Sequence, residues 1–184
     1  MQPFPTIDQA YDWYVSTRDG LASLGSYVWM RETRLNISDR TLDELFGMTE
    51  SEWQTYYELN LDKHELFSAL SLFAACEGGI RRDFDWRVQG DNGQKHHQRF
   101  LNEYKKHGAD ERITLATLID NWLAAERGNV WLRRQLLELK TLFARRNDLA
   151  HGRSGESVSF DVIFEKLNRI RTKWRDGVDD FRGY

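Results

Sequence analysis

The sequence predicts an all-α protein, a helical up-and-down bundle of about six or seven helices. Apolar residues recur at spacings of three and four over most of the chain. No convincing run alternates apolar and polar residues between turn signals, as a strand would. With 184 residues, only 2 Pro and 13 Gly, the chain suits one domain spanning residues 1–184. Residues 1–48 are either part of this domain or an N-terminal helical extension of it.

Capping residues and glycines divide the helical pattern into segments. Thr6 or Asp8 can cap the first helix, and Thr49 with Glu52 has the form of a capping box. Gly20 and Gly25 leave residues 20–37 unassigned. The predicted helices are, in order, one through Val15, one at 42–46 ending at Gly47, one to about Arg87 with a break near 60–62, one at 94–106 before Gly108, one at 113–126 capped by Asp110, one capped by Asn129 and running to Ala150, and one from Phe160 to about Val178.

Composition excludes several classes of protein. The single cysteine, Cys76, excludes a disulfide framework and a multi-cysteine zinc site. The net charge of −3 excludes a uniformly basic nucleic-acid coat, so any positive surface must be local. No apolar run approaches the ~18 residues that span a bilayer. The N-terminal sequence also lacks the basic and apolar regions of a secretion signal. We therefore expect a cytoplasmic protein without membrane contact.

Two charged residues interrupt apolar helical stripes. Arg146 fills the missing position of a stripe formed by Leu132, Leu136, Leu139, Phe143 and Ala150. Glu77 fills the missing position of another, formed by Leu66, Leu70, Phe73, Ile80 and Phe84. Pairing would offset part of the cost of desolvating both charges. We expect either an ion pair between Glu77 and Arg146, or two side chains that reach water independently.

The segment Arg145 to Arg153 is a dense polar cluster at a predicted helix end. Gly152 suits the left-handed conformation that closes a helix, which places His151 in the last turn. The carbonyl-rich end of a helix stabilises an imidazolium ion. On an ideal helix, Arg146 and His151 point about 140° apart. They converge only if the helix end unwinds or if a second copy of the chain completes the site.

The run Arg146-Asn147-Asp148-Leu149-Ala150-His151, followed by Gly152, resembles the Arg-polar-x-x-x-His signature of the HEPN superfamily. Glu77 to Phe84 resembles an acidic helix segment of bacterial members, and the resemblance covers about residues 60–180. It implies a HEPN-like bundle that forms a homodimer with both Arg–His motifs in one cleft. Many members are metal-independent endoribonucleases of toxin–antitoxin and other defence systems. Others have lost catalysis and bind nucleotides or protein partners.

The residue types suit RNA cleavage without a metal or other cofactor. RNA carries its own nucleophile, the 2′-OH. His151 can accept its proton or protonate the leaving 5′-oxygen, and Arg146 can grip the phosphate. The products would carry 2′,3′-cyclic phosphate and 5′-OH ends. The predicted supporting residues are Asn147, Asp148 and Glu77. Asn147 would orient the histidine or bond the phosphate, and Glu77 would orient Arg146. The predicted RNA contacts are Arg145, Arg153, Arg81 and Arg82.

Two other functions stay open: a catalytically inactive HEPN domain that binds nucleotide or a protein partner, and a structural dimerisation bundle. Trp131, with Trp122 and Trp174, is expected in the core or a dimer interface, although an exposed one can stack on a base. The histidines at 96 and 97 point to different helix faces, so with Lys95 they predict a solvated basic surface. The cations at 169–175 are interpreted as surface electrostatics.

Overall fold

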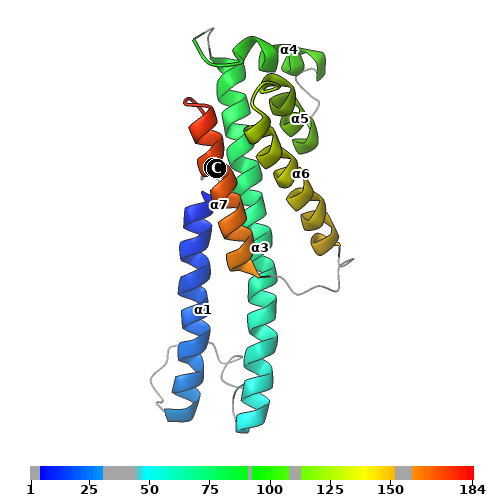
Figure 1. Cartoon of the computed structure of the whole chain (residues 1–184). Coiled ribbons are helices and arrows are strands. Elements are labelled where there is room, and N and C mark those ends of the chain that lie inside the picture. The colour runs from blue at the N-terminus through cyan, green and yellow to red at the C-terminus, as the bar shows by residue number, and fades with distance from the viewer. Residues whose placement is uncertain (1–4, 31–44, 46, 91–92, 108–112, 152–158) are drawn as a thin grey trace.

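The computed structural model describes residues 5–30, 45, 47–90, 93–107, 113–151 and 159–184. These parts of the chain contain helices and no strand, which confirms the all-α prediction (Figure 1). Within them, no helix combines the length and the apolar composition that crossing a bilayer requires. The helices are α1 (Ile7–Met30), α3 (Glu50–Gln89), α4 (His97–His107), α5 (Leu115–Ala125), α6 (Val130–Ala150) and α7 (Phe160–Gly177).

Helix α1 is longer than predicted. Thr6 begins it, since its Oγ1 accepts a hydrogen bond from the Gln9 amide and its own amide donates to Gln9 Oε1. The helix then continues through Gly20 and Gly25 to Met30. Gly25 lies where α1 meets α3, and a Cβ there would come within 2.6 Å of the Trp53 ring. The glycine is thus a close-packing position and does not end the helix.

Helix α3 is a single unbroken helix of 40 residues. The predicted capping box is confirmed, because Thr49 and Glu52 bond to each other's backbone amides. The predicted break near residues 60–62 is wrong. Asn60 donates its side-chain amide to the Tyr56 carbonyl one turn earlier, so it is accommodated inside the helix. The short helix predicted at 42–46 lies almost entirely outside the described residues.

The later helices follow their predicted boundaries closely. Asn129 caps α6 by accepting from the Leu132 amide, and Ser159 caps α7. Helix α5 is capped by Thr114, which accepts from the Thr117 amide. Asp110, the predicted cap, lies outside the described residues. Helix α4 begins only at His97, because residues 93–96 form a turn.

The core lies where α4 to α7 pack around the second half of α3 (Figure 1). Phe73 of α3 meets Phe143 of α6 edge to face, with ring centroids 5.4 Å apart. Trp122 and Trp174 are fully buried and meet edge to face at 5.2 Å. Helix α1 joins this core through Ile7, Ala10 and Tyr14. Among the described helices, only α1 and the first part of α3 extend below α5 to α7, as a two-helix arm.

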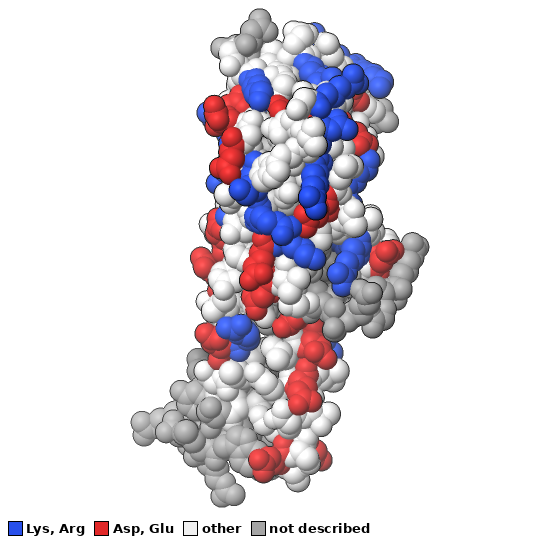
Figure 2. Space-filling model, viewed as in Figure 1, with Lys and Arg blue, Asp and Glu red and all other residues white. Residues whose placement is uncertain are grey.

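The acidic and basic residues are distributed unevenly between the two-helix arm and the rest of the molecule. We define the arm as α1 with residues 50–67 of α3, and the body as the described residues from Ser68 onward. The arm carries eight Asp or Glu and two Lys or Arg, whereas the body carries 13 acidic and 19 basic residues. Figure 2 shows the Lys and Arg gathered over the upper part of this face. The positive charge is therefore local, although the whole chain is acidic.

Candidate functional site

Arg146 lies on the core-facing side of α6, as the interrupted stripe predicts. Leu139 and Phe143, earlier in the stripe, are buried and Arg146 itself is half-buried, whereas Ala150 is exposed, contrary to the pattern. Arg146 Nη1 donates to Asn147 Oδ1 at 3.1 Å. Its Nε is buried without a hydrogen-bond partner among the described residues. Since a guanidinium has five N–H donors, most are not used by the contact with Asn147.

Glu77 does not form the predicted ion pair with Arg146. Its Oε1 accepts from Arg81 Nε at 2.9 Å and from Arg81 Nη2 at 2.7 Å, within α3. The reason is helix direction: α3 and α6 run antiparallel (Figure 1) and meet at Phe73 and Phe143. Glu77 lies four residues after Phe73 on α3, and Arg146 lies three residues after Phe143 on α6. Because the two helices are antiparallel, these offsets point in opposite directions. At about 1.5 Å per residue they lie roughly 10 Å apart along the axes.

His151 is the exposed C-terminal cap of α6. Its amide donates to the Asn147 carbonyl at 3.1 Å, and its φ of −100° and ψ of 6° keep the chain close to helical. The helix therefore does not unwind before His151. Arg146 and His151 of one chain diverge by about the 140° of an ideal helix. The unwound helix end, one of the two ways expected to bring them together, is therefore not observed.

The other predicted site residues are divided between surface and structure. Asn147, Asp148 and Arg145 are exposed around the end of α6, and Arg82 is exposed on α3. Arg81 is held by Glu77 and also donates to the Ile113 carbonyl at 2.9 Å, so it ties α3 to the start of α5. Arg153 lies outside the described residues.

Cys76 is fully buried in the core, and burial raises the pKa of its thiol, as expected for a small apolar residue. Within the ranges that the structure describes, no group of three or more His, Cys, Asp or Glu is placed to hold a metal ion.

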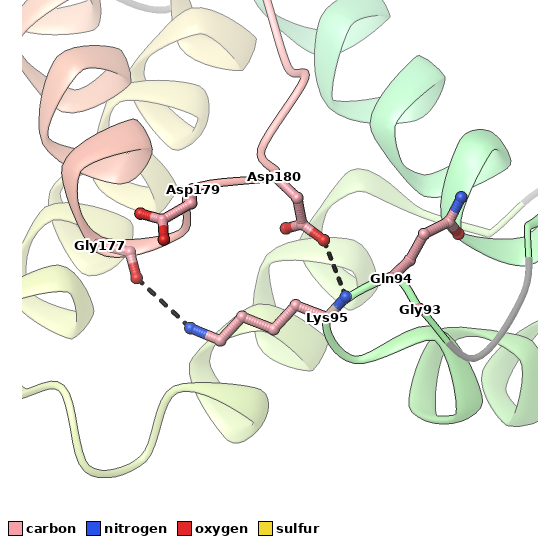
Figure 3. A pocket seen from close by; sticks show the side chains of 6 residues that line it. All are labelled: Gly93, Gln94, Lys95, Gly177, Asp179 and Asp180. Atoms are coloured by element: carbon pink, nitrogen blue, oxygen red, sulfur yellow. Dashed lines mark hydrogen bonds between the residues drawn. The ribbon is translucent and has the colours of Figure 1, made fainter.

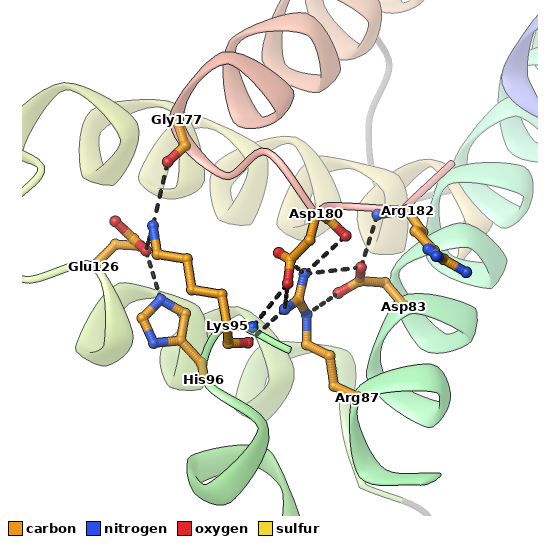
Figure 4. A network of polar contacts seen from close by, with 8 residues as sticks. All are labelled: Asp83, Arg87, Lys95, His96, Glu126, Gly177, Asp180 and Arg182. Carbon is orange, nitrogen blue, oxygen red and sulfur yellow. Dashed lines mark hydrogen bonds and ion pairs between the residues drawn. The ribbon is translucent and has the colours of Figure 1, made fainter. Parts of the chain in front are cut away.

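A second polar cluster closes the opposite end of the body (Figure 4). Arg87 is fully buried, and its guanidinium binds Asp83 at 2.8 Å and Asp180 at 2.9 Å. The Arg87 Cζ also lies 4.6 Å from the centre of the Trp122 ring, a cation–π contact. These contacts join α3, α5 and the segment after α7.

Lys95 and His96 adjoin this cluster on the surface. Both bind the buried Glu126 Oε1, Lys95 Nζ at 2.9 Å and His96 Nε2 at 2.6 Å. Burial works to raise the pKa of Glu126, but the bonds from Lys95 and His96 lower it overall. His96 has a φ of 63°, a left-handed conformation that costs a non-glycine residue energy. The basic surface predicted here is therefore ordered by Glu126.

Lys95 lines two hollows in this surface. One, of about 410 Å³, has Lys95 Nζ bonded to the Gly177 carbonyl and the Lys95 amide bonded to Asp180 (Figure 3). The other, of about 700 Å³, is lined by Lys95, His96, Glu126 and the exposed start of α6. Both hollows lie at the N-terminal end of α6, and His151 lies at its C-terminal end.

Sequence reasoning missed the Arg87 cluster and the ordering of His96. The available signal for the first was the spacing of Asp83 and Arg87, four residues apart on one helix. Nothing in the sequence pointed to Asp180 or Glu126 as the distant partners.

No protein-family model, curated protein or solved structure matches the chain.

Proposed function

We propose that the chain is a HEPN-type, metal-independent endoribonuclease in which Arg146 and His151 carry the reaction. The observation that supports this most is the end of α6. There His151 is exposed on a helix end, and the half-buried Arg146 keeps N–H donors beyond the one bound to Asn147. The excess of basic residues on the body also favours a polyanionic substrate.

The proposed chemistry uses the 2′-OH of RNA as the nucleophile. His151 takes the 2′-OH proton or protonates the leaving 5′-oxygen, near neutral pH. Arg146 binds the phosphate and stabilises the charge that develops on it, while Asn147 holds the guanidinium. The 2′-oxygen bonds to phosphorus as the bond to the 5′-oxygen breaks. The products are a 2′,3′-cyclic phosphate and a 5′-OH, and DNA is not cut.

The divergence of Arg146 and His151 makes a homodimer part of this proposal. Because α6 stays helical to His151, the two groups of one chain face different directions. A second copy can supply the missing partner in a composite site. The same divergence supports the alternative, an inactive HEPN domain that binds nucleotide or a protein partner.

The test is digestion of total RNA by the purified protein in EDTA, followed by end-group analysis. Wild type should leave 2′,3′-cyclic phosphate and 5′-OH ends. His151→Ala and Arg146→Ala should each lower the rate by about 100-fold or more. His107→Ala, at the end of α4, is the matched control and should retain full activity. Strict dependence on Mg²⁺, or full activity of His151→Ala, contradicts the proposal; RNA binding without cleavage favours the inactive alternative.

The proposed setting is a toxin–antitoxin or antiphage defence system, with an antitoxin or defence-complex protein as partner. Expression of the wild-type chain should then slow growth in a host that lacks this partner. His151→Ala and Arg146→Ala should relieve the effect, and His107→Ala should not. Equal toxicity of all variants contradicts a nuclease toxin.

A further inference from the structure

A line of aromatic and basic side chains follows the junction of α6 and α7. These helices run antiparallel, so residue numbers rise on α7 as they fall on α6. Lys173 Nζ lies 4.9 Å from the centre of the Trp131 ring, and Arg169 forms an ion pair with Glu138. These two contacts fix which side of α6 faces α7.

Arg134 and Arg145 lie on the same side of α6 as Glu138. At about 100° per residue, each is within roughly 40° of Glu138 around the helix. Both are exposed. We call the set the seam; its members are Trp131, Arg134, Glu138 and Arg145 of α6 with Arg169 and Lys173 of α7. Four of these six residues are cationic and one is acidic. Arg169 pairs with Glu138, and Lys173 Nζ also lies 3.8 Å from Asp176, so the seam has a modest excess of positive charge.

Trp131 forms one end of the seam and is open to solvent. Its side chain is 44% exposed. It also lines the hollow of about 700 Å³ that Lys95 and His96 line. Figure 4 shows how Glu126 holds these two groups together. This shallow, open hollow has an exposed tryptophan and cationic neighbours, which suits a flat ring attached to an anionic backbone.

We propose that the seam binds single-stranded RNA, with one base stacked on Trp131 and the backbone phosphates on Arg134 and Arg145. Arg145 precedes Arg146 near the end of α6, so a strand on the seam reaches the level of the proposed reaction site along the helix axis. Trp131 and Arg145 are 14 residues apart on α6, roughly 21 Å, which about six nucleotides of a stacked strand span. This substrate class rests on the proposed function, and it revises the expectation that the cations of the last helix are ordinary surface charge.

Binding of single-stranded DNA to the wild-type chain tests the seam without cleavage. Fluorescence anisotropy with labelled oligo(dA) of about 12 nucleotides should give a Kd that Trp131→Ala weakens roughly 10-fold. Trp131→Phe should keep most of the affinity. Trp13→Ala is the matched control, since Trp13 is 49% exposed but lies on the acidic arm. An oligonucleotide of about four residues cannot span the seam and should bind weakly to all variants.

Arg134→Ala provides a second variant that removes one phosphate contact. It should lower the slope of log K against log salt by about one unit. Equal binding by wild type and Trp131→Ala, or equal weakening by Trp13→Ala, overturns the seam.

Different results would contradict the seam proposal and the nuclease proposal. If RNA is cut at the same KM by wild type and Trp131→Ala, the nuclease stands and the seam is wrong. If RNA is not cut but oligo(dA) binding depends on Trp131, the seam stands and the nuclease is wrong. If both hold, Trp131→Ala should raise KM for RNA of about 12 nucleotides and leave kcat unchanged.

Discussion

The guanidinium of Arg87 lies 2.9 Å from the carboxylate of Asp180, which is 93 residues further along the chain. Arg87 also binds Asp83 on its own helix and the Lys95 carbonyl. All of these bonds form around a guanidinium with no exposed surface. The cluster thereby fixes the end of the body that carries Lys95 and His96, at a distance from His151.

Removing Arg87 should destabilise the fold strongly. Arg87→Ala would leave the Asp83 carboxylate buried without its ionic partner, and burial already raises the pKa of that carboxyl group. Breaking such a buried pair costs about 3–5 kcal/mol. Urea unfolding should show this loss, whereas Arg127→Ala, an exposed arginine, should change stability by about 0.5 kcal/mol or less. A loss below about 1 kcal/mol for Arg87→Ala would show that the cluster is not structural.

Two glycines of α1 should respond in opposite directions to the same substitution. Gly25→Ala would place a Cβ 2.6 Å from the rigid Trp53 ring, and such overpacking costs about 1–3 kcal/mol. Gly20→Ala meets no atom within 4 Å and should stabilise the helix by about 0.5–1 kcal/mol. Thermal melts of the two variants measure the difference. A higher Tm for Gly25→Ala than for wild type would mean that α1 and α3 pack less closely than described.

Local features of the fold could be predicted from the sequence, and distant partners could not. Asn129 and Thr49 cap their helices through bonds to residues three positions away, so the signal is contained in a short window. The side of α6 that carries Arg146 follows from helical periodicity alone. The partner of Glu77 instead depends on the relative register of α3 and α6. That register is set by packing at Phe73 and Phe143, which the spacing of residues does not encode.

Asp8 should make a pH-dependent contribution to stability. Both of its oxygens accept from Arg171, at 2.7 and 2.8 Å, which joins α1 to α7. The bond from Arg171 lowers the pKa of Asp8 from its ordinary value of 3.8. A lowered pKa means that the stabilisation is complete above about pH 4–5 and is lost as the pH falls through the folded-state pKa.

The variant Asp8→Asn measures this contribution. At pH 7 its Tm should be roughly 1–4 °C below that of wild type, and the difference should vanish near pH 2–3. Asp12→Asn, one turn further along α1, is the matched control and should follow wild type at both pH values. A Tm difference that persists unchanged at low pH contradicts an electrostatic origin.

Glu77 should have little effect on RNA cleavage, in contrast to the role first predicted for it. Its carboxylate is bound to Arg81, and it lies away from Arg146 along the bundle. We therefore expect Glu77→Gln to cut RNA within about 2-fold of the wild-type rate, while Arg146→Ala loses about 100-fold or more. Single-turnover cleavage assays in EDTA compare the cleavage rates of these two variants with that of wild type. A large loss of kcat in a folded Glu77→Gln protein would restore Glu77 as a positioning residue.

Mixing two inactive variants should reveal whether the proposed site is shared between copies. In a homodimer whose sites each combine Arg146 of one chain with His151 of the other, a mixed dimer of Arg146→Ala and His151→Ala retains one intact pair. Random assortment makes half of the dimers mixed, and each has one of two sites intact, so about one quarter of wild-type activity should return.

The complementation depends on the divergence of the two side chains around α6. If one chain supplied both groups to one site, neither variant could repair the other, and the mixture would be as inactive as its components. The two proteins should be mixed after partial unfolding and refolded together, so that subunits exchange. Wild-type protein that is unfolded and refolded in the same way gives the reference rate. Each variant refolded alone gives the background rate. If dimers that are shown to be mixed have only background activity, the active site does not combine Arg146 of one copy with His151 of the other.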